Sequence, residues 1–411
     1  MIANEKKRVI VVGAGPVGAI TTLALVQKGI PVLLIEAEPE PVEDQRAATL
    51  HAPTLAMLAA LGLERQAFAD DASGGFQAPL FQFRDRASGE LVATFDIRLL
   101  DGEVSYPFVL QWEQYKLVRA VLPLVAQKGL AELRFATKLT GLTQHADHVD
   151  IAVENADGET ETLRGAYVIG ADGGRSAVRR LSDIDFEGFT WEERFIKIAT
   201  SFDFSAGTGY CTRNYFSDPD EWLNLFKVKG VGPPGYWRGI MPVMAGETDE
   251  QALGMDSIQR RLHSIYDKSG DFDIPYYALY SVHQRVAATF NKGRVFLAGD
   301  SAHVNNPIGG MGMNGGIHDA VNLAEKLAAV WYRRADASVF DRYTRQRRKA
   351  QTDFVQAQSI LNKKTLSEKD PVIRRQHLDD LRRTSEDVAL HKKYLFRSSL
   401  IDSLNAANAV E

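Results

Sequence analysis

The sequence predicts an α/β protein with a helix-covered parallel sheet, a second, mostly antiparallel sheet, and C-terminal helices. Three observations support this fold class. A strand–helix–strand pattern fills the first 36 residues, short aromatic-rich strands fill residues 190–280, and a charged helical pattern fills residues 340–411. The first pattern is typical of a parallel βαβ unit, whereas short strands separated by turns indicate antiparallel pairing.

The N-terminal unit begins with Val9–Val12, a continuous apolar run that stops at a glycine. Such a run is typical of a strand buried on both faces. Residues 16–28 carry apolar side chains at helical spacing, and Gly29 provides a helix stop. Ile30–Ile35 is a second apolar strand. These segments predict two parallel strands joined by a helix.

The segments that follow alternate between helical and strand patterns. Residues 54–61 and 111–128 predict helices, whereas residues 76–110 show the alternation of antiparallel strands. Residues 131–170 predict strands with turns, including the hairpin dipeptide Asp157-Gly158.

The second half of the chain is expected to close the parallel sheet and then turn helical. Residues 294–298 predict a short buried strand, followed by a glycine-rich loop and a helix over residues 315–331. The tail 340–411 predicts helices with a break near Asp370-Pro371, because proline cannot continue a helix.

Composition limits the functional class. The 411 residues carry a formal net charge of -5 and are 45% hydrophobic, as expected for a globular protein of two or three domains. We expect no nucleic-acid partner, because that usually requires a basic face. Cys211 is the single cysteine, so no internal disulfide can form, and no apolar run reaches the ~18 residues that span a membrane. We therefore expect a cytoplasmic protein, monomeric or homodimeric, without a membrane partner.

The first motif is Gly13-Ala14-Gly15-Pro16-Val17-Gly18, which matches G-x-G-x-x-G between the first strand and helix. Here the first glycine allows a tight turn, the second lets the backbone approach a pyrophosphate, and the third lets helix and strand pack closely. The helix N-terminus adds N–H groups for the phosphates. Glu36, at the end of the second strand, can accept hydrogen bonds from an adenosine ribose and would repel a 2′-phosphate. The motif predicts FAD or NAD.

Two further motifs follow later strands. Residues 166–170 lead into Asp172-Gly173, which alone could be a turn before a capped helix. Residues 294–298 lead into Asp300, which is placed to accept a hydrogen bond from a polyol hydroxyl, and the loop Gly309–Asn314 offers N–H groups to an electron-rich ring. A flavin with its ribityl chain needs this second loop, whereas a simple NAD-dependent dehydrogenase does not. The combination favours FAD.

In this order and spacing, the three motifs resemble the para-hydroxybenzoate hydroxylase family of FAD-dependent monooxygenases, the group A aromatic hydroxylases, over about residues 8–335. The resemblance implies a Rossmann-like FAD-binding domain. It assigns the first loop to the ADP part of FAD, the Asp172 stretch to FAD and a transient nicotinamide cofactor, and Gln111, expected at a helix start, to the flavin. The FAD-binding residues that it implies are Gly13, Ala14, Gly15, Pro16, Val17, Gly18, Glu36, Ala37, Arg46, Gln111, Leu139, Asp172, Asp300, Pro307, Gly312, Met313 and Asn314.

The same resemblance suggests a division into domains. The FAD-binding domain would consist of residues 1–75, 108–188 and 281–340, and the substrate-binding domain of residues 76–107 and 189–280. Residues 341–411 would form a C-terminal helical region, with no sign of the thioredoxin-like domain that longer relatives carry there.

The reaction is also implied by the resemblance. NADH or NADPH would reduce the flavin, O2 would add to it, and the resulting flavin hydroperoxide would hydroxylate an electron-rich phenol, aromatic acid or hydroxypyridine. The protein would exclude water and stabilise the charge of the reduced flavin through helix 315–331. Ile308 stands where para-hydroxybenzoate hydroxylase has a hydroxylated side chain near its substrate, which disfavours that substrate here.

A base that removes a phenol proton would raise the rate. His51, Tyr215 and Tyr236 are candidates for this catalytic role, although each could be an ordinary buried side chain. His303 is expected to be structural, and the nine histidines suggest no metal site.

Two alternatives remain open. One is a flavin halogenase or prenyl-chain reductase on the same fold. Halogenases of this type usually carry Trp-x-Trp-x-Ile-Pro, which the segment Trp237–Pro242 does not match. The other is a non-catalytic binding protein that retained the fold, which we would expect to have lost the intact Gly309–Asn314 loop.

Overall fold

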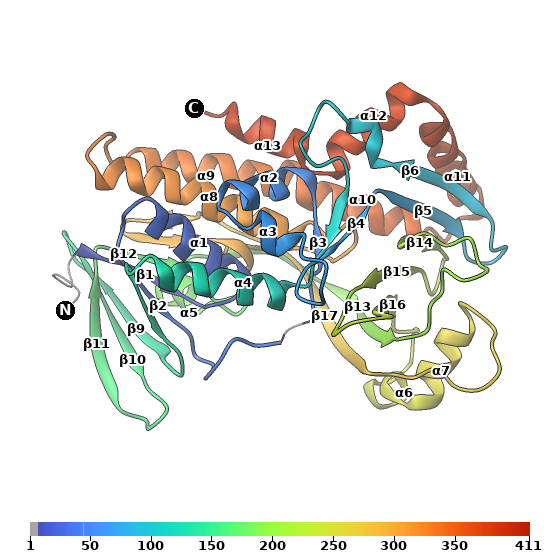
Figure 1. The fold of residues 1–411 in the computed structure, drawn as a ribbon, viewed down its shortest axis with the longest axis horizontal. Helices are drawn as coiled ribbons and strands as arrows, with labels where there is room; N and C mark the ends of the chain where they lie inside the picture. The colour runs from blue at the N-terminus through green and yellow to red at the C-terminus, as the bar shows by residue number, and fades with distance from the viewer. Residues whose placement is uncertain (1–6, 44) are drawn as a thin grey trace.

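Two large β-sheets dominate the computed structural model, which describes residues 7–43 and 45–411 (Figure 1). The six-stranded sheet and its helices form the left part of Figure 1, and the eight-stranded sheet forms the right part. C-terminal helices run along the top. The predicted fold class is confirmed.

The six-stranded sheet has the order β18-β19-β12-β1-β2-β8. It is parallel from β19 to β8, and the edge pair β18–β19 is antiparallel. Its strands are β1 (Val9–Val12), β2 (Val32–Ile35), β8 (Ala131–Arg134), β12 (Tyr167–Gly170), β18 (Asn291–Lys292) and β19 (Val295–Leu297). β1, β2 and β19 are buried along their whole length, as their apolar runs predict.

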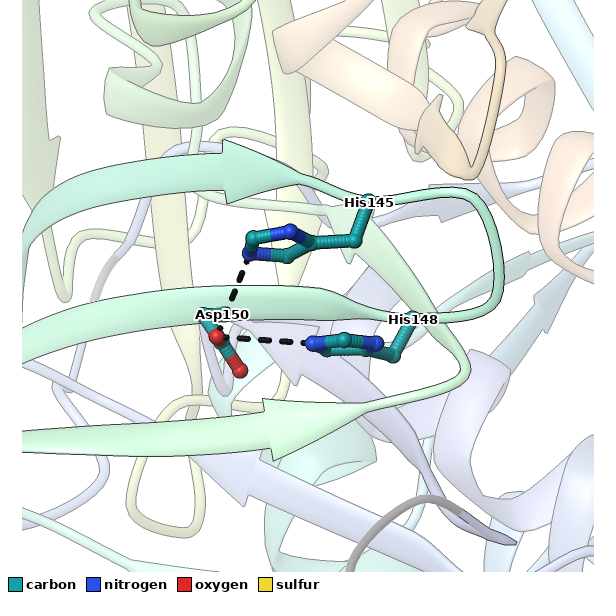
Figure 2. A group of neighbouring side chains, drawn as sticks. All are labelled: His145, His148 and Asp150. Atoms are coloured by element: carbon teal, nitrogen blue, oxygen red, sulfur yellow. Dashed lines mark ion pairs between the residues drawn. The ribbon is translucent and has the colours of Figure 1, made fainter.

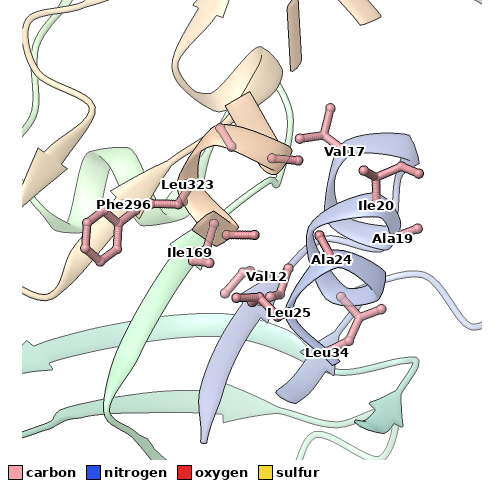
Figure 3. Packing of buried hydrophobic residues seen from close by; sticks show 14 of the residues in the cluster. Val12, Val17, Ala19, Ile20, Ala24, Leu25, Leu34, Ile169, Phe296 and Leu323 are labelled. Carbon is pink, nitrogen blue, oxygen red and sulfur yellow. The ribbon is translucent and has the colours of Figure 1, made fainter. Parts of the chain in front are cut away.

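Helix α1 (Pro16–Gln27) packs against both α4 (Gln114–Gln127) and α8 (Gly312–Trp331). Figure 3 shows Ala24 and Leu25 of α1 packed beside Val12 of β1. Full burial of a leucine contributes about 1.5–3 kcal/mol relative to an exposed one. The N-cap residue of α1 supplies no side-chain hydrogen bond, so α1 is stabilised mainly by this apolar packing.

A three-stranded antiparallel sheet extends from this half at the lower left of Figure 1. It consists of β9 (Lys138–Gln144), β10 (Val149–Glu154) and β11 (Thr160–Gly165). The predicted turn Asp157-Gly158 joins β10 to β11, and Gly158 has the positive φ (+78°) that such a turn requires.

The eight-stranded sheet has the order β20-β17-β13-β16-β15-β14-β5-β6, and only β14–β5 is parallel. Its strands are β5 (Leu80–Asp85), β6 (Leu91–Asp96), β13 (Phe186–Thr200), β14 (Arg213–Ser217), β15 (Leu223–Val228), β16 (Tyr236–Pro242), β17 (Tyr276–Ala287) and β20 (His303–Val304). Residues of α6 (Asp249–Leu253) and α7 (Met255–His263) join one of its apolar clusters. Aromatic residues of β5, β14 and the C-terminal helices fill another.

A small sheet, β3-β7-β4, lies between the left and right parts of Figure 1. It pairs β3 (Thr49–Leu50) and β4 (Phe76–Ala78) with β7 (Val109–Gln111). The short helices are α2 (Ala52–Ala60), α3 (Glu64–Ala67), α5 (Ala177–Leu181) and the 3₁₀ helix Ile97–Leu100.

The C-terminal region is helical, as predicted. It contains α9 (Val339–Lys349), a π-helical segment (Ala350–Gln356), α10 (Ala357–Leu366), α11 (Pro371–Glu386), α12 (Val388–Ser398) and α13 (Ile401–Asn408). The expected break falls before Pro371, where Asp370 caps α11 through bonds from the N–H groups of Val372 and Ile373.

Two expected helix boundaries are wrong. Gln111 lies in β7 rather than at a helix start, because its backbone pairs with Thr49 and Phe76, and α4 begins at Gln114. Helix α8 begins at Gly312, three residues before the expected position. Glycines suggested a loop there, but packing in the buried core favours the helical conformation.

The division into domains stays a prediction. The strands of the six-stranded sheet fall in the segments assigned to FAD binding. However, β4 from the other segment pairs with β7, and β17 crosses the expected boundary at residue 281. None of the helices in the described part of the chain is long and apolar enough to cross a membrane.

Candidate active site

The three sequence motifs meet at one edge of the six-stranded sheet. Four neighbouring strands end in the same row of paired residues, Val12, Ile35, Gly170 and Leu297. The glycine loop follows the first of these ends, Glu36 the second, Asp172 the third and Asp300 the fourth. In open parallel sheets, ligands bind beyond the carboxyl ends of the strands.

The glycine loop is shaped by contacts that only glycine allows. Gly13 has φ +100°, and a Cβ there would lie 2.5 Å from the carbonyl oxygen of Ala171. A Cβ at Gly18 would clash with the carbonyl group of Gly13. A Cβ at Gly15, by contrast, would meet nothing within 4 Å. Gly13 and Gly18 therefore serve packing, while Gly15 leaves open space at the N-terminus of α1, as a pyrophosphate cradle requires.

The carboxylate of Glu36 is tied to the backbone around it. Its Oε2 accepts a hydrogen bond from the N–H of Ala14 at 2.6 Å, and its Oε1 accepts one from Glu38 at 3.0 Å. The N–H of Thr137 donates to the carbonyl oxygen of Glu36 at 2.8 Å. This bond brings the chain just before Leu139, which the resemblance assigns to FAD, beside the predicted ribose contact.

Asp172 binds the N-terminus of α5, whose N-cap residue is Ser176, and this is the structural role that the sequence left open. Its carboxylate accepts hydrogen bonds from Oγ of Ser176 at 2.5 Å and from the N–H groups of Ala177 and Val178 at 2.7 and 3.1 Å. Burial raises the pKa of Asp172, although these hydrogen bonds act in the opposite direction. A contact of Asp172 with FAD or a nicotinamide stays a prediction.

Asp300 lies in a 3₁₀ turn, Gly299–Ser301, whose backbone is fixed on both sides. The N–H of Gly299 donates to Oδ2 of Asp319 at 3.0 Å. Oγ of Ser301 donates to the carbonyl oxygen of Gly170 at 2.6 Å. These bonds hold Asp300 next to β12, where the predicted ribityl chain would pass.

Asp319 anchors this turn from the buried face of α8. It pairs with His303 at 2.7 Å and with Arg347 at 2.6 Å, and all three side chains are buried. Burial alone would raise the pKa of Asp319, but His303 and Arg347 together hold it below its usual value. His303 therefore has the structural role that the sequence suggested.

Gly312–Asn314 form the first turn of α8, so their N–H groups have no acceptor one turn earlier in the helix. The side chain of Asn314 is fully buried. Its Oδ1 accepts from the N–H of His51 at 2.8 Å, and its Nδ2 donates to the carbonyl oxygens of Thr49 at 2.8 Å and Gly310 at 2.7 Å. Asn314 thus fixes β3 and the turn before α8 relative to each other.

Gln111 supplies a buried hydrogen-bond donor that fits a flavin. Its Oε1 accepts from Oγ1 of Thr49 at 3.1 Å, while its Nε2 is buried without a partner among the described residues. An unpartnered buried donor costs about 1–3 kcal/mol, which a bound acceptor would remove. With the open space at Gly15, these residues fit FAD. Of the other implied residues, Ala37 is exposed and Pro307 half-buried.

Arg46 lies on an exposed segment that the larger sheet anchors through Gln45. The carbonyl oxygen of Gln45 accepts from Nζ of Lys197 on β13 at 2.9 Å and from Nη1 of Arg238 on β16 at 3.0 Å. Its Oε1 accepts from Nη2 of Arg238 at 2.6 Å. No local pattern indicates these two cations, because strands far along the chain supply them.

A small cavity lies beside the loop that precedes α8. Ile308 and Gly309 of this loop form part of its wall. Phe81 and Phe83 of β5 and Tyr394 of α12 give it an aromatic lining. Ring packing is continuous from β5 to α12: Phe81 stacks on Phe95 at 5.0 Å, which stacks on Tyr394 at 4.4 Å. No carboxylate occurs among the described residues that line the cavity.

His51 brings an uncharged imidazole to this cavity. Its Nε2 lies 2.9 Å from the carbonyl oxygen of Gly309. Because a carbonyl can only accept, Nε2 carries the proton, and Nδ1 keeps a lone pair without a partner among the described residues. Burial, followed by the charge of Arg213, lowers the pKa of His51 to about 4. His51 can therefore accept a hydrogen bond at neutral pH but is a weak base.

The other two candidate bases lie in different environments. Tyr215 lines the cavity, and its hydroxyl accepts a hydrogen bond from Nη2 of Arg213 at 3.2 Å. Tyr236 is not among the lining residues, and its ring packs over Gly230. The structure thus brings His51 and Tyr215 together but leaves Tyr236 outside.

Several lining residues escaped the sequence analysis. The candidate base Tyr215 points to Arg213, because residues two apart in a strand lie on the same face of the sheet. Tyr394, Ser398 and Ser399 carry no local signal, because only the tertiary fold brings α12 to β5.

A second cluster of titratable residues lies at the β9–β10 turn (Figure 2). His145 and His148 each contact Oδ2 of Asp150, at 3.3 and 3.5 Å, and one ligand atom of each of the three residues lies within 4.8 Å of the others. Their rings stack in parallel at 4.3 Å, so their lone pairs do not converge, and Arg164 binds both oxygens of Asp150 at 2.7 and 2.9 Å. We assign this cluster to the hairpin's stability.

Comparison with known proteins agrees with the geometry of the site. The family model described as FAD binding domain matches residues 6–358. The chain belongs to this family. The expected resemblance to FAD-dependent aromatic monooxygenases is confirmed, as is the enzyme class.

Named relatives cover almost the whole chain. Para-nitrophenol 4-monooxygenase of Pseudomonas sp. (strain WBC-3) is 32% identical over 98% of this chain and 97% of its own. The 6-hydroxy-3-succinoylpyridine 3-monooxygenase HspB of Pseudomonas putida (strain DSM 28022 / S16) is 29% identical over 90% of this chain and 91% of its own. The crystal structure of p-nitrophenol 4-monooxygenase PnpA from Pseudomonas putida DLL-E4 superposes with a TM-score of 0.89 at 30% identity, covering 97% and 98% of the two chains.

Proposed function

We propose that this chain is a single-component FAD-dependent monooxygenase that uses NADH or NADPH and O2 to hydroxylate a small phenol. One observation carries the proposal: the aromatic cavity adjoins the start of α8, where the predicted flavin contacts lie. Relatives named for a nitrophenol and a hydroxypyridine support an aromatic ring that carries a hydroxyl group as substrate.

The protein's own groups have distinct roles in this proposal. The glycine loop and Glu36 hold the ADP part of FAD, Asp300 the ribityl chain, and Gln111 with the first turn of α8 the flavin ring. The positive end of the α8 dipole stabilises negative charge on that ring. The walls formed by Phe81 and Tyr394 exclude water and confine the substrate ring. Bound FAD supplies hydride acceptance from the nicotinamide and the activation of O2.

Halogenation is the less favoured alternative. The Trp237–Pro242 segment does not match the halogenase pattern, and it lies in β16, where Trp237 is buried against the α6–α7 cluster. The named relatives are monooxygenases.

The proposal is tested by measuring NADH and NADPH oxidation by the purified, FAD-loaded protein over a panel of phenols, aromatic acids and hydroxypyridines. We expect at least one phenol to raise the rate of oxidation and to be recovered with an added hydroxyl group. Oxidation that no aromatic compound stimulates would contradict it.

Asp300 provides a test of the cofactor site itself. Asp300→Ala should weaken FAD binding by about 10–100-fold, because a carboxylate acceptor for ribityl hydroxyls is lost. Asp336→Ala, in the exposed loop between α8 and α9, is the matched control. Fluorescence titration of the FAD-stripped proteins measures both affinities, and equal affinities would remove the role assigned to Asp300.

A further inference from the structure

Arg213 is a buried cation in the wall of the cavity. The residue is 5% exposed, and its guanidinium carbon lies 5.4 Å from the centre of the Phe81 ring. Its one side-chain hydrogen bond within the described chain goes to the neutral hydroxyl of Tyr215. Residues 7–43 and 45–411 provide no carboxylate ion pair for Arg213. An unpaired buried charge is costly, so its retention calls for a binding partner.

Other buried arginines of this protein have their acceptors built in. Arg261 pairs with two glutamates, and Arg347 pairs with Asp319. Arg179 donates to two backbone carbonyl oxygens, at 2.7 and 2.8 Å. Arg213 differs from all three, because neither an anion nor a carbonyl oxygen of the described residues accepts from its guanidinium.

The rest of the cavity is suited to an aromatic ring that carries the missing anion. Phe83 stacks on Tyr215 with ring centres 5.1 Å apart, and both side chains line the cavity together with Arg213. Tyr215 accepts from Arg213 and keeps its own proton free to donate. Two donors, one of them charged, thus face the same space.

His51 shows why the anion should arrive already formed. The Nδ1 atom of His51 has a lone pair that can accept a proton. However, burial and the charge of Arg213 make the imidazole a weak base. A proton on an ordinary phenol, with a pKa of about 10, would not move to it at neutral pH. Substituents that withdraw electrons lower the pKa of a phenol, so such compounds are anions in solution.

We infer that Arg213 and the hydroxyl of Tyr215 form an oxyanion-binding site, and that the enzyme selects phenols that are ionised before they bind. This inference rests on the proposed function. A carboxylate on the ring would also supply an anionic oxygen. However, Arg213 is the charged group that we assign to the substrate, and hydroxylation requires an electron-rich ring. A phenolate oxygen at Arg213 satisfies both conditions with a single group.

Ligand binding to the FAD-loaded protein tests this site without turnover. The probes are 4-nitrophenol, 4-nitroanisole, which has the same shape but cannot ionise, and 4-hydroxybenzoate, whose anion is a carboxylate. Equilibrium dialysis gives each Kd for the wild type, Arg213→Met, Arg213→Lys and the exposed-arginine control Arg65→Met.

We expect Arg213→Met to weaken binding of 4-nitrophenolate about 100-fold, Arg213→Lys to recover part of it, and Arg65→Met to have no effect. Binding of 4-nitroanisole should be weak and unchanged by all three substitutions. Affinity of 4-nitrophenolate within threefold of wild type in Arg213→Met would overturn the inference. So would equally tight, Arg213-dependent binding of 4-hydroxybenzoate, which would assign the site to carboxylates.

If Arg213→Met does not fold, the pH dependence of ligand binding to the wild type tests whether the ionised phenol is the form that binds. Affinity for 4-nitrophenol should rise tenfold per pH unit up to the pKa of the phenol and then level off. Burial lowers the pKa of His51, which lines the cavity, to about 4, and raises the pKa of Tyr394, which also lines it. Burial also raises the pKa of Cys211, whose thiol interacts with Arg213, so none of these three groups accounts for such a rise near neutral pH. Affinity that rises toward low pH would contradict the site.

The inference and the proposed function can fail separately. Arg213-dependent binding of 4-nitrophenolate without any hydroxylated product would leave the oxyanion site intact and remove the monooxygenase role for phenols. Hydroxylation of phenols with no dependence of binding on Arg213 would do the reverse.

Discussion

At the residue scale, the glycine loop separates packing from ligand binding. Gly18 and Gly13 leave no room for a side chain because backbone atoms occupy the space. A Cβ at Gly15 would meet no atom within 4 Å, and this residue has an ordinary φ of -64°. The same residue type is therefore required for two different reasons within six residues.

This difference predicts opposite effects of two alanine substitutions. Gly15→Ala should cost the FAD-stripped protein less than about 1 kcal/mol of unfolding free energy, as for an N-cap change, yet weaken FAD binding at least about tenfold. Gly18→Ala should lower the unfolding free energy by at least about 2 kcal/mol, because α1 must shift. Urea unfolding and FAD titration of both variants check this. A Gly15→Ala protein that binds FAD normally would contradict the cradle.

At the element scale, the start of α8 is joined to β3 through one side chain. Asn314 satisfies the N–H of His51 and the carbonyl oxygens of Thr49 and Gly310. The start of α8, which would face the flavin, and β3, which leads directly into His51, are thus fixed together. Backbone interactions alone would not set this arrangement, since β3 is only two residues long.

Asn314→Ala should therefore destabilise the protein by about 2–4 kcal/mol, because three buried backbone groups lose their partner. FAD affinity should fall with it. Asn405→Ala, on the exposed side of α13, is the control and should change neither quantity. Denaturant unfolding with and without FAD gives both numbers, and a loss below about 0.5 kcal/mol would show that Asn314 does not join these elements.

At the scale of the whole molecule, two buried histidines make stability depend on pH. The pKa of His51 is lowered to about 4, and that of His318, beside Thr54, to about 3, in both cases mainly by burial. The ordinary value of 6.5 applies in the unfolded chain, so the unfolded state binds more protons between that value and each lowered pKa. Stability must then fall as pH falls below 6.5.

For His51 alone the linkage amounts to about 3 kcal/mol between pH 6.5 and pH 4. His318→Gln should reduce the slope of unfolding free energy against pH in this window, whereas His263→Gln, at the end of α7, serves as the control histidine. Urea unfolding between pH 4.5 and 7.5 measures these slopes. An unfolding free energy that stays constant over that range would show that the buried histidines do not bind protons on unfolding.

Local patterns explain which parts of the molecule could be predicted. Strands β1 and β2 and the glycine loop are specified by neighbouring residues, so their positions follow from spacing. Gln111 was misplaced because apolar residues run on into the helix, and only pairing with β3 and β4 reveals a strand. The cavity depends on α12 meeting β5, about 300 residues apart in the chain, and no local pattern encodes that contact.

We propose that this protein uses FAD at the sheet edge to hydroxylate a phenol in the adjoining cavity. Incubation of the FAD-loaded protein with NADH or NADPH and a panel of ionisable phenols under ¹⁸O₂, followed by mass spectrometry, tests this claim. The predicted result is phenol-dependent nicotinamide oxidation, with one ¹⁸O atom in the hydroxylated ring. Nicotinamide oxidation that yields only hydrogen peroxide with every phenol would contradict the claim.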